Sequence, residues 1–453
     1  MGYLIRGGEL IHADRRERAD LLLCGERIET VAPNIDPAGH RVIDAEDCLV
    51  FAGFIDPHTH FDMECGAETT ADDFISGSRA AVLGGTTSVI DFAEPYRGDT
   101  LQDAFANWLN KARRSSCNYA FHMTLPRWDS AVASEMAVLA GSGVPSFKAY
   151  TIYDMMLSDE ALCFAMETTA RLGALLCIHC ENDGMIRFAT ERLHRKGHSG
   201  LSYFARSRPP ESEAEAVSRV LRMARLTGAR VYLVHLSTAE SLEEVRRARK
   251  AGARVSAETC PQYLLLTEER YEGEHPEAFV MNPPLRTQRD CEALWDGLAD
   301  GTIQTVGTDH CSFTTQQKLA LGGTIGAVPG GCAGVAQRAQ LLYTYGVRAN
   351  RIPLERMASL LSEEPARLFG LRGRGRLSPG LAADVVVWDP NYRNIITNGN
   401  HLHACDRSPY AGFAVFGRPR AVVLSGRLVA ECGELLLPGT GRFLPGQAER
   451  PSL

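Results

Sequence analysis

Both ends of the chain contain short segments in which apolar and polar positions alternate, with glycines between the segments. At the N-terminal end these are residues 3–5, 21–24 and 28–31, and at the C-terminal end they are residues 384–388 and 422–429. Alternation with a period of two, bounded by turn residues, is typical of antiparallel strands. We therefore predict one small β-sandwich that is built from both ends of the chain.

The middle of the chain alternates between apolar segments and helical patterns instead. Helical stretches lie between most of the apolar segments; one is residues 70–84, where Thr70 is placed to cap the helix. Eight segments have the length and composition of buried strands: residues 48–56, 86–92, 119–125, 147–152, 174–180, 231–236, 255–260 and 303–309. Eight strands, each followed by a crossover, predict a parallel (β/α)8 barrel.

A doubly wound open sheet is the alternative α/β architecture, but no glycine-rich dinucleotide-binding turn follows the first strand. We therefore assign residues 50–371 to a catalytic barrel, and residues 1–49 and 372–453 to the two parts of the sandwich domain. In such barrels the side chains at the C-terminal ends of the strands carry the chemistry.

Composition and charge narrow the class of protein. The formal net charge is -7, and no run of lysines or arginines contradicts it, which disfavours a nucleic-acid partner. No apolar segment reaches membrane-spanning length, and the N-terminal residues lack the pattern of a targeting segment. The cysteines have no repeating spacing, and the C-x-x-C pair Cys177 and Cys180 straddles a histidine at a strand end. We therefore expect reduced thiols and a cytoplasmic enzyme without a membrane partner.

Two histidines follow the first strand of the predicted barrel. His58 and His60 are two positions apart, so in an extended strand they project from the same face. Such a pair can supply the first two ligands of a metal site. Taken alone, such a pair is more often two histidines that only make structural hydrogen bonds, and the rest of the chain has to supply further ligands.

Further chemistry-bearing side chains occur at the ends of other predicted strands. They are Lys148, His179, His235 and Asp309, each after an apolar segment. Neutral imidazoles with a carboxylate suit zinc or a similar divalent ion. An ammonium group cannot bind a cation, so Lys148 needs either a structural role or conversion to a carbamate by carbon dioxide.

These residues lie in segments that resemble the dihydropyrimidinase and hydantoinase group of the amidohydrolase superfamily. The segments are residues 53–63, 147–148, 258–264, 282–286, 308–313 and 317–318. The resemblance covers nearly the whole chain, including the split sandwich. It implies a homotetramer or homodimer that acts on a small cyclic amide.

The resemblance also implies a ligand set. In that family two zinc ions are held at the positions that match His58, His60, carboxylated Lys148, His179, His235 and Asp309. A hydroxide that bridges the two metals would attack a ring amide carbon and open hydantoins or dihydropyrimidines to N-carbamoyl amino acids. Asp309, beside that hydroxide, would take its proton and deliver it to the leaving nitrogen.

Other positions concern the substrate. The resemblance gives Tyr153 the role of stabilising the oxyanion, where a plain packing aromatic is the alternative. It also implies that Asn282 and Gly330 hold the ring amide, although a serine and an asparagine are usual there. Residues 63–67, with Met63 and Cys65, would line the space beside ring carbon five, together with residues 152–157, which contain Met155 and Met156. Cys65 stands where a bulky leucine or phenylalanine is common.

Three other functions stay open at this point. Relatives that bind acidic rings have an arginine at the position of Asp62, and allantoinase-like relatives have an asparagine there, so neither pattern matches. A non-catalytic scaffold of the same fold is disfavoured because all six ligand residues are present. A hydrolase of acyclic amides is the third alternative, which a substrate panel would separate.

Overall fold

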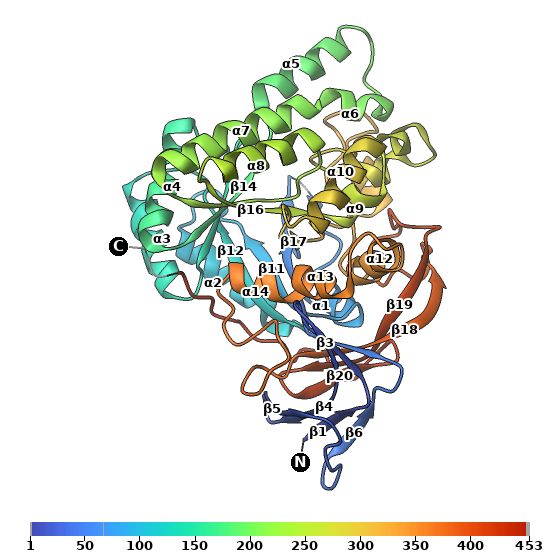
Figure 1. Cartoon of the computed structure of the whole chain (residues 1–453). Coiled ribbons are helices and arrows are strands. Elements are labelled where there is room, and N and C mark those ends of the chain that lie inside the picture. The colour runs from blue at the N-terminus through green and yellow to red at the C-terminus, as the bar shows by residue number, and fades with distance from the viewer. Residues whose placement is uncertain (1, 67, 450–453) are drawn as a thin grey trace.

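Eight parallel strands form the central sheet of the computed structural model, which describes residues 2–66 and 68–449. They lie in the order of the sequence: β8 (Phe54–Thr59), β11 (Thr86–Ala93), β12 (Asn118–Thr124), β13 (Ser146–Tyr150), β14 (Leu175–His179), β15 (Arg230–Leu233), β16 (Arg254–Thr259) and β17 (Thr305–Val306). Helices surround this sheet, as Figure 1 shows. The predicted (β/α)8 barrel is confirmed, although its last strand is much shorter than the apolar segment that predicted it.

The barrel closes between β8 and the segment that follows β17. Thr308 donates a hydrogen bond from its hydroxyl to Asp56, 2.7 Å away. The guanidinium of Arg338 is buried at this seam and donates to the carbonyls of Ile55 (2.8 Å) and Val306 (2.9 Å). Side-chain hydrogen bonds therefore complete the closure where the short β17 offers few backbone partners.

The helices follow the strands along the chain and cover the outside of the barrel (Figure 1). They are α1 (Phe74–Leu83), α2 (Leu101–Lys111), α3 (Ser130–Gly141), α4 (Asp159–Leu172), α5 (Asp183–His194), α6 (Phe204–Ser207), α7 (Pro210–Thr227), α8 (Ala239–Lys250), α9 (Pro261–Leu265), α10 (Gln288–Ala299), α11 (Thr315–Leu319), α12 (Arg338–Leu342), α13 (Leu354–Ala358) and α14 (Glu364–Leu368). Short helical segments are η1 (Ala112–Arg114), η2 (Leu201–Tyr203), η3 (Glu268–Glu272), η4 (Pro276–Phe279), η5 (Tyr343–Val347) and η6 (Ser359–Glu363). Within the described residues, no helix combines the length and apolar character needed to cross a membrane.

Helix α1 begins later than its sequence predicts. Asp73, not Thr70, caps it, because the Asp73 carboxylate accepts hydrogen bonds from the amides of Ile75 and Ser76. The hydroxyl of Thr70 instead accepts from the amide of Met63 at 3.0 Å. Thr70 therefore fixes the loop that follows β8 rather than the helix.

Two further sheets form the sandwich domain below the barrel (Figure 1). The smaller sheet contains β5 (Arg27–Ala32), β4 (Asp20–Cys24), β1 (Tyr3–Arg6) and β6 (Arg41–Asp44). The larger contains β21 (Glu434–Leu435), β20 (Arg427–Glu431), β19 (Ala414–Leu424), β18 (Val385–Ile395), β7 (Leu49–Ala52), β2 (Glu9–Ile11) and β3 (Arg16–Arg18). In β18, Val385 and Val387 face the core between the sheets, whereas Val386 and Trp388 face the barrel. Both faces of the larger sheet are therefore buried.

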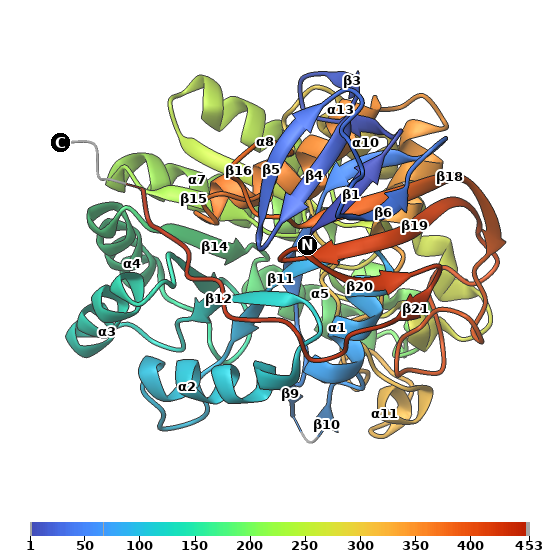
Figure 2. The same cartoon turned by 90° about the horizontal axis from the view of Figure 1, so that it is seen from below.

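The predicted domain limits differ from the structure at two points. The segment predicted as the first barrel strand is divided at Gly53: β7 pairs with β18 and β2 of the sandwich, and β8 alone joins the barrel. At the other end of the chain, the tail does not stay with the sandwich. Figure 2 shows it crossing the underside of the barrel, where the amide of Leu444 donates to the Tyr119 carbonyl (2.7 Å) and that of Glu449 donates to Gly173 (3.0 Å).

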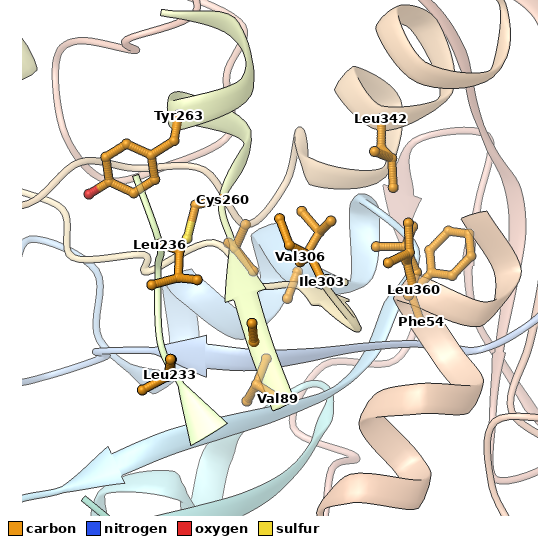
Figure 3. Packing of buried hydrophobic residues seen from close by; sticks show 14 of the residues in the cluster. Phe54, Val89, Leu233, Leu236, Cys260, Tyr263, Ile303, Val306, Leu342 and Leu360 are labelled. Atoms are coloured by element: carbon orange, nitrogen blue, oxygen red, sulfur yellow. The ribbon is translucent and has the colours of Figure 1, made fainter. Parts of the chain in front are cut away.

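The inside of the barrel is filled by apolar side chains below and is polar above. Ile90, Ala120 and Leu175 project inward from β11, β12 and β14, and Phe369 and Leu444 close the lower end. Outside the barrel, side chains of β15 to β17 pack with the surrounding helices (Figure 3). This packing leaves the C-terminal ends of the strands as the end where polar groups gather.

Candidate metal centre and active-site cavity

A cavity of about 270 Å³ lies at the C-terminal ends of the barrel strands. Every residue that the sequence predicts for the site lines it: His58, His60, Met63, Cys65, Lys148, Tyr153, His179, His235, Asn282, Asp309 and Gly330. The fold thus brings together side chains that come from six strands and the loops after them. Their roles as ligands or substrate contacts stay predictions.

Three of the predicted ligands form a tight group. Nε2 of His58 lies 3.0 Å from Oδ1 of Asp309, and Nε2 of His60 lies 3.2 Å from the same oxygen. The candidate ligand atoms of these three residues all lie within 4.8 Å of one another. Two imidazole nitrogens and a carboxylate at this spacing fit the donor set of a zinc-type ion.

The other predicted ligands lie beside this group. The His235 ring centroid is 5.4 Å from that of His58 and 4.6 Å from that of His179. The Lys148 amine lies 4.7 Å from the ring centroid of Phe92, against which the rings of His58 and His60 also pack. Phe92 therefore forms an apolar floor beneath His58, His60 and Lys148.

Buried carboxylates fix two of the histidines. Nδ1 of His58 lies 2.7 Å from Glu258, and Nε2 of His179 lies 2.7 Å from Glu181. Histidines that bind metals commonly donate their other N–H to a carboxylate, which sets the tautomer. This arrangement leaves Nε2 of His58 and Nδ1 of His179 as the nitrogens available to a metal.

An unpartnered nitrogen supports the same assignment. Nδ1 of His235 is buried and has no hydrogen-bond partner among the residues that the structure describes, and Nε2 of His58 has only its 3.0 Å contact with the Asp309 carboxylate. Buried polar atoms without a partner are costly and rare in folded proteins. The donor atoms, their spacing and their fixed tautomers therefore fit a bound divalent ion.

The electrostatics of the cluster favour a cation. Burial lowers the pKa of His60 to about 4 and also lowers the pKa values of His179 and His235, so these rings are neutral and able to bind a metal. Burial also opposes the charged form of His58, but the Glu258 and Asp309 carboxylates outweigh it and raise its pKa to about 9. The field at His58 is therefore negative.

Lys148 is buried inside the barrel. Its amine lies over the rings of Phe92 (4.7 Å) and Tyr150 (5.0 Å), and it forms no ion pair within residues 2–66 and 68–449. Burial lowers its pKa. A neutral amine is the form that captures carbon dioxide, so these surroundings are compatible with the predicted carbamate.

Three predicted site residues have a left-handed backbone conformation, which residues other than glycine rarely adopt. The φ angles are 71° at Tyr153, 39° at His235 and 52° at Asp309. Such conformations cost roughly 1–3 kcal/mol each and persist where the surrounding structure imposes them. All three line the same cavity, and strained positions of this kind cluster at active sites.

The two departures from the hydantoinase pattern lie in contact with each other. A Cβ atom at Gly330 would lie 2.8 Å from Nδ2 of Asn282, which is closer than such atoms approach in proteins. The larger side chain at position 282 therefore requires the smallest residue at position 330.

The loops beside these residues agree only in part with the prediction. Met63, Cys65 and Met155 line the cavity, and Cys65 belongs to the small hairpin of β9 (Glu64–Cys65) and β10 (Glu68–Thr69). Met156, which was grouped with Met155, is 48% exposed and does not line the cavity. Ala67, predicted for the same wall, lies outside the described residues.

Among the residues that line the cavity, sequence reasoning missed Glu94 and Tyr150, and it did not single out Cys311 and Gly331. The Tyr150 hydroxyl donates to Glu94 at 3.3 Å, and burial raises the pKa of Glu94 to about 7. Strand periodicity could have found both, because Glu94 is two positions after Phe92 and Tyr150 two after Lys148. No pattern in the sequence pointed to Arg208, which contacts Tyr153 from a loop.

Comparisons with known proteins extend over nearly the whole chain. The model of the Amidohydrolase family matches residues 49–429. The D-hydantoinase of Geobacillus stearothermophilus is 37% identical over 98% of this chain and 96% of its own length, and the D-phenylhydantoinase of Escherichia coli O9:H4 (strain HS) is 37% identical over 98% of both. The crystal structure of dihydropyrimidinase from Brevibacillus agri NCHU1002 covers 100% of both chains with a TM-score of 0.96 and 33% identity.

Proposed function

The chain belongs to the amidohydrolase family, and we propose that it opens the rings of hydantoins or dihydropyrimidines to N-carbamoyl amino acids. It is a hydrolase that acts on the C–N bonds of cyclic amides. The convergence of His58, His60 and Asp309 at one cavity, together with the full-length similarity to hydantoinases, carries this proposal. An allantoinase or a non-catalytic scaffold is not favoured, since the relatives are hydantoinases and all six ligand residues are present.

We propose that two divalent ions, zinc in the first place, occupy the cavity. His58 and His60 would hold one, His179 and His235 the other, and Asp309 and a carbamate on Lys148 would complete the set. When bound, such a pair lowers the pKa of a water molecule and polarises a carbonyl oxygen. The unpartnered Nδ1 of His235, the negative field around His58 and the surroundings of Lys148 support this assignment.

The protein's own groups would act around that centre. Asp309 would hold the proton of the attacking water and transfer it to the leaving ring nitrogen. The ionised form suits this role: burial opposes it, but His58, His60 and His235 outweigh burial and hold the pKa of Asp309 well below its usual range. Tyr153 would donate a hydrogen bond to the oxygen of the attacked carbonyl.

Asn282 and Gly330 would present the backbone groups that hold the ring amide. Their loops are fastened to each other, because the amide of Gly331 donates to the carbonyl of Val280 at 3.0 Å. Lys318 donates to the same carbonyl (2.8 Å) and to that of Gly331 (2.7 Å). Met63 and Cys65 would face the ring substituent, since they line the cavity from the loop that follows β8.

We also propose a homotetramer or homodimer located in the cytoplasm. Free thiols at all thirteen cysteines agree with a reducing compartment. Light scattering of the purified protein measures the assembly: a monomer at working concentrations would contradict the proposal.

A substrate panel tests the function. The zinc-loaded protein is assayed with hydantoin, 5-substituted hydantoins, dihydrouracil and allantoin, and its metal content is measured by elemental analysis. We expect close to two metals per chain and N-carbamoyl products from the first three classes. If allantoin is the only substrate that turns over, the protein is an allantoinase. If the protein holds two metals and opens none of these rings, the proposed activity is wrong.

A further inference from the structure

The guanidinium of Arg208 lies beside the hydroxyl of Tyr153. Arg208 occupies the loop between α6 and α7 and is only 9% exposed. Its Nη2 donates to the Tyr153 hydroxyl oxygen at 3.3 Å, and its central carbon lies 5.8 Å from the centroid of the tyrosine ring. A buried cation therefore touches the group that would stabilise the oxyanion.

The same guanidinium is linked to a predicted metal ligand. Nε and Nη2 of Arg208 donate to the two carboxylate oxygens of Glu181, the first at 3.0 Å. Glu181 in turn faces Nε2 of His179 at 2.7 Å. One fork-shaped side chain thus joins Tyr153 to the carboxylate that fixes His179.

Arg208 is itself held in place from the other side. Its backbone carbonyl accepts a hydrogen bond from the buried guanidinium of Arg286, and Nε of Arg286 donates to the hydroxyl of Ser237 at 3.1 Å. The position of the Arg208 fork is therefore determined by packed structure, not by Tyr153. A fixed donor can act as a reference point for the tyrosine.

The chemistry of arginine determines how the tyrosine hydroxyl is used. A guanidinium has donors and no acceptor, so the Tyr153 oxygen can only accept from it. The hydroxyl proton is then directed away from Arg208. We propose that Arg208 is a positioning residue: it holds Tyr153 in its left-handed conformation and directs the hydroxyl proton into the cavity toward the carbonyl oxygen under attack.

Two observations support this assignment. Tyr153 has a φ of 71°, a conformation that an aromatic residue does not keep without an external contact. The Tyr153 ring centroid also lies 5.3 Å from that of His179, so the ring packs beside a predicted ligand while its hydroxyl contacts Arg208. The guanidinium also polarises the O–H bond, which strengthens its donation to a developing negative charge.

A double-mutant cycle tests the coupling, and it rests on the proposed ring-opening activity. Tyr153→Phe should lower kcat by roughly 100- to 1,000-fold, the scale of one lost oxyanion donor. Arg208→Met should lower kcat by about tenfold or more, with KM nearly unchanged. In the Tyr153→Phe background, the same arginine substitution should cost less than about threefold, because the group through which it acts is gone.

A matched variant separates coupling from general damage. Arg356 is a partly buried arginine that donates to the carbonyls of Leu298 and Ile303 and does not line the cavity. Arg356→Met should change kcat by the same small factor in both backgrounds. If Arg208→Met also costs the same factor in both backgrounds, Arg208 does not act through Tyr153 and the proposal is overturned.

A crystal structure of the zinc-loaded Arg208→Met protein, and of Arg208→Lys, gives a readout that needs no turnover. We expect Tyr153 to leave the left-handed region and its hydroxyl to turn out of the cavity in the methionine variant. An unchanged Tyr153 in that variant would overturn the proposal. A wild-type protein that opens no ring would count against the proposed function, whereas this structure would still decide whether Arg208 holds Tyr153.

Discussion

The two ends of the barrel use the same unusual backbone conformation with different residues. On the underside, the left-handed positions beside the C-terminal tail are glycines: Gly143, Gly173 and Gly370 have φ angles of 96°, 65° and 64°. A Cβ atom at Gly173 would lie only 1.8 Å from the carbonyl oxygen of Glu449. At this end glycine allows close packing of the tail, and the conformation costs little.

At the upper end three left-handed positions carry the side chains that we propose as functional. They are Tyr153, His235 and Asp309, which all line the cavity. Each of these residues adopts the conformation at a cost in stability that glycine avoids. The comparison indicates that the lower end contributes stability, whereas the upper end gives up stability to aim its side chains.

Asp309→Asn makes the strongest test of this division. Asparagine tolerates the left-handed region, so the substitution keeps the backbone and removes the charge. We expect kcat to fall by roughly 100- to 10,000-fold, the scale of a lost general base, while the melting temperature stays the same or rises. Steady-state kinetics and thermal unfolding of the zinc-loaded variant measure both; wild-type turnover would remove Asp309 from the proposed mechanism.

Asp20→Asn is the matched control. Asp20 is a buried carboxylate in the sandwich that accepts from the amides of Gly7 and Ile35, both at 2.9 Å. Its amide variant should lose stability by about 1–3 kcal/mol and keep kcat, because one acceptor is lost far from the cavity. The two variants should therefore show opposite profiles.

Lys148→Ala addresses the second half of the metal centre. We expect the metal content to fall from close to two per chain toward one, and kcat to fall by roughly 100- to 1,000-fold as one electrostatic contribution is lost. A short carboxylic acid added to this variant should restore part of the activity by taking the place of the carbamate. Full activity without any additive would show that Lys148 is only structural.

Leu444→Ala examines the lower end. Leu444 is buried where the tail closes the barrel, so its truncation should cost about 2–5 kcal/mol of unfolding free energy. The kcat of the folded fraction should stay unchanged. Leu436→Ala, at a 42% exposed position of the same C-terminal region, should change stability by less than about 0.5 kcal/mol. If kcat of Leu444→Ala falls although its metal content is full, the lower end also affects catalysis, and the proposed division between the two ends is wrong.

The sequence was sufficient for features that depend on local pattern and residue type. Apolar segments of strand length located six of the eight barrel strands closely, and polar residues at the strand ends identified the cavity. It failed where long-range packing decides. The apolar segment that ends at Asp56 divides at Gly53, because its first half, β7, pairs with β18 from the far end of the chain. The prediction that Thr70 caps helix α1 is wrong, because its hydroxyl accepts a hydrogen bond from the amide of Met63 in the loop after β8.

The supporting groups of the site were equally out of reach of the sequence. Glu258 and Glu181 lie in segments that the sequence analysis used, but no local sequence pattern indicates that each faces a histidine. Arg208 comes from a loop between two helices and meets Tyr153 only in the folded chain. The reacting residues follow strand periodicity, whereas the residues that orient them follow only from tertiary structure.

Cys65→Phe tests the smallest effect, which lies within the upper end itself. Cys65 faces the cavity from the β9–β10 hairpin, and Met63 and Met155 lie in the same wall. A thiol leaves more room than a bulky ring, and methionines repack around groups of different shape. We therefore expect hydantoins with an aromatic or large aliphatic 5-substituent to be cleaved at least as well as dihydrouracil.

Phenylalanine at position 65 should penalise the bulky substrates alone, by about 1–3 kcal/mol in kcat/KM, because it fills the space that their substituent needs. Relative kcat/KM values for a 5-benzyl hydantoin and dihydrouracil measure this. A strong preference for dihydrouracil that Cys65→Phe leaves unchanged would mean that the hairpin does not contact the substituent.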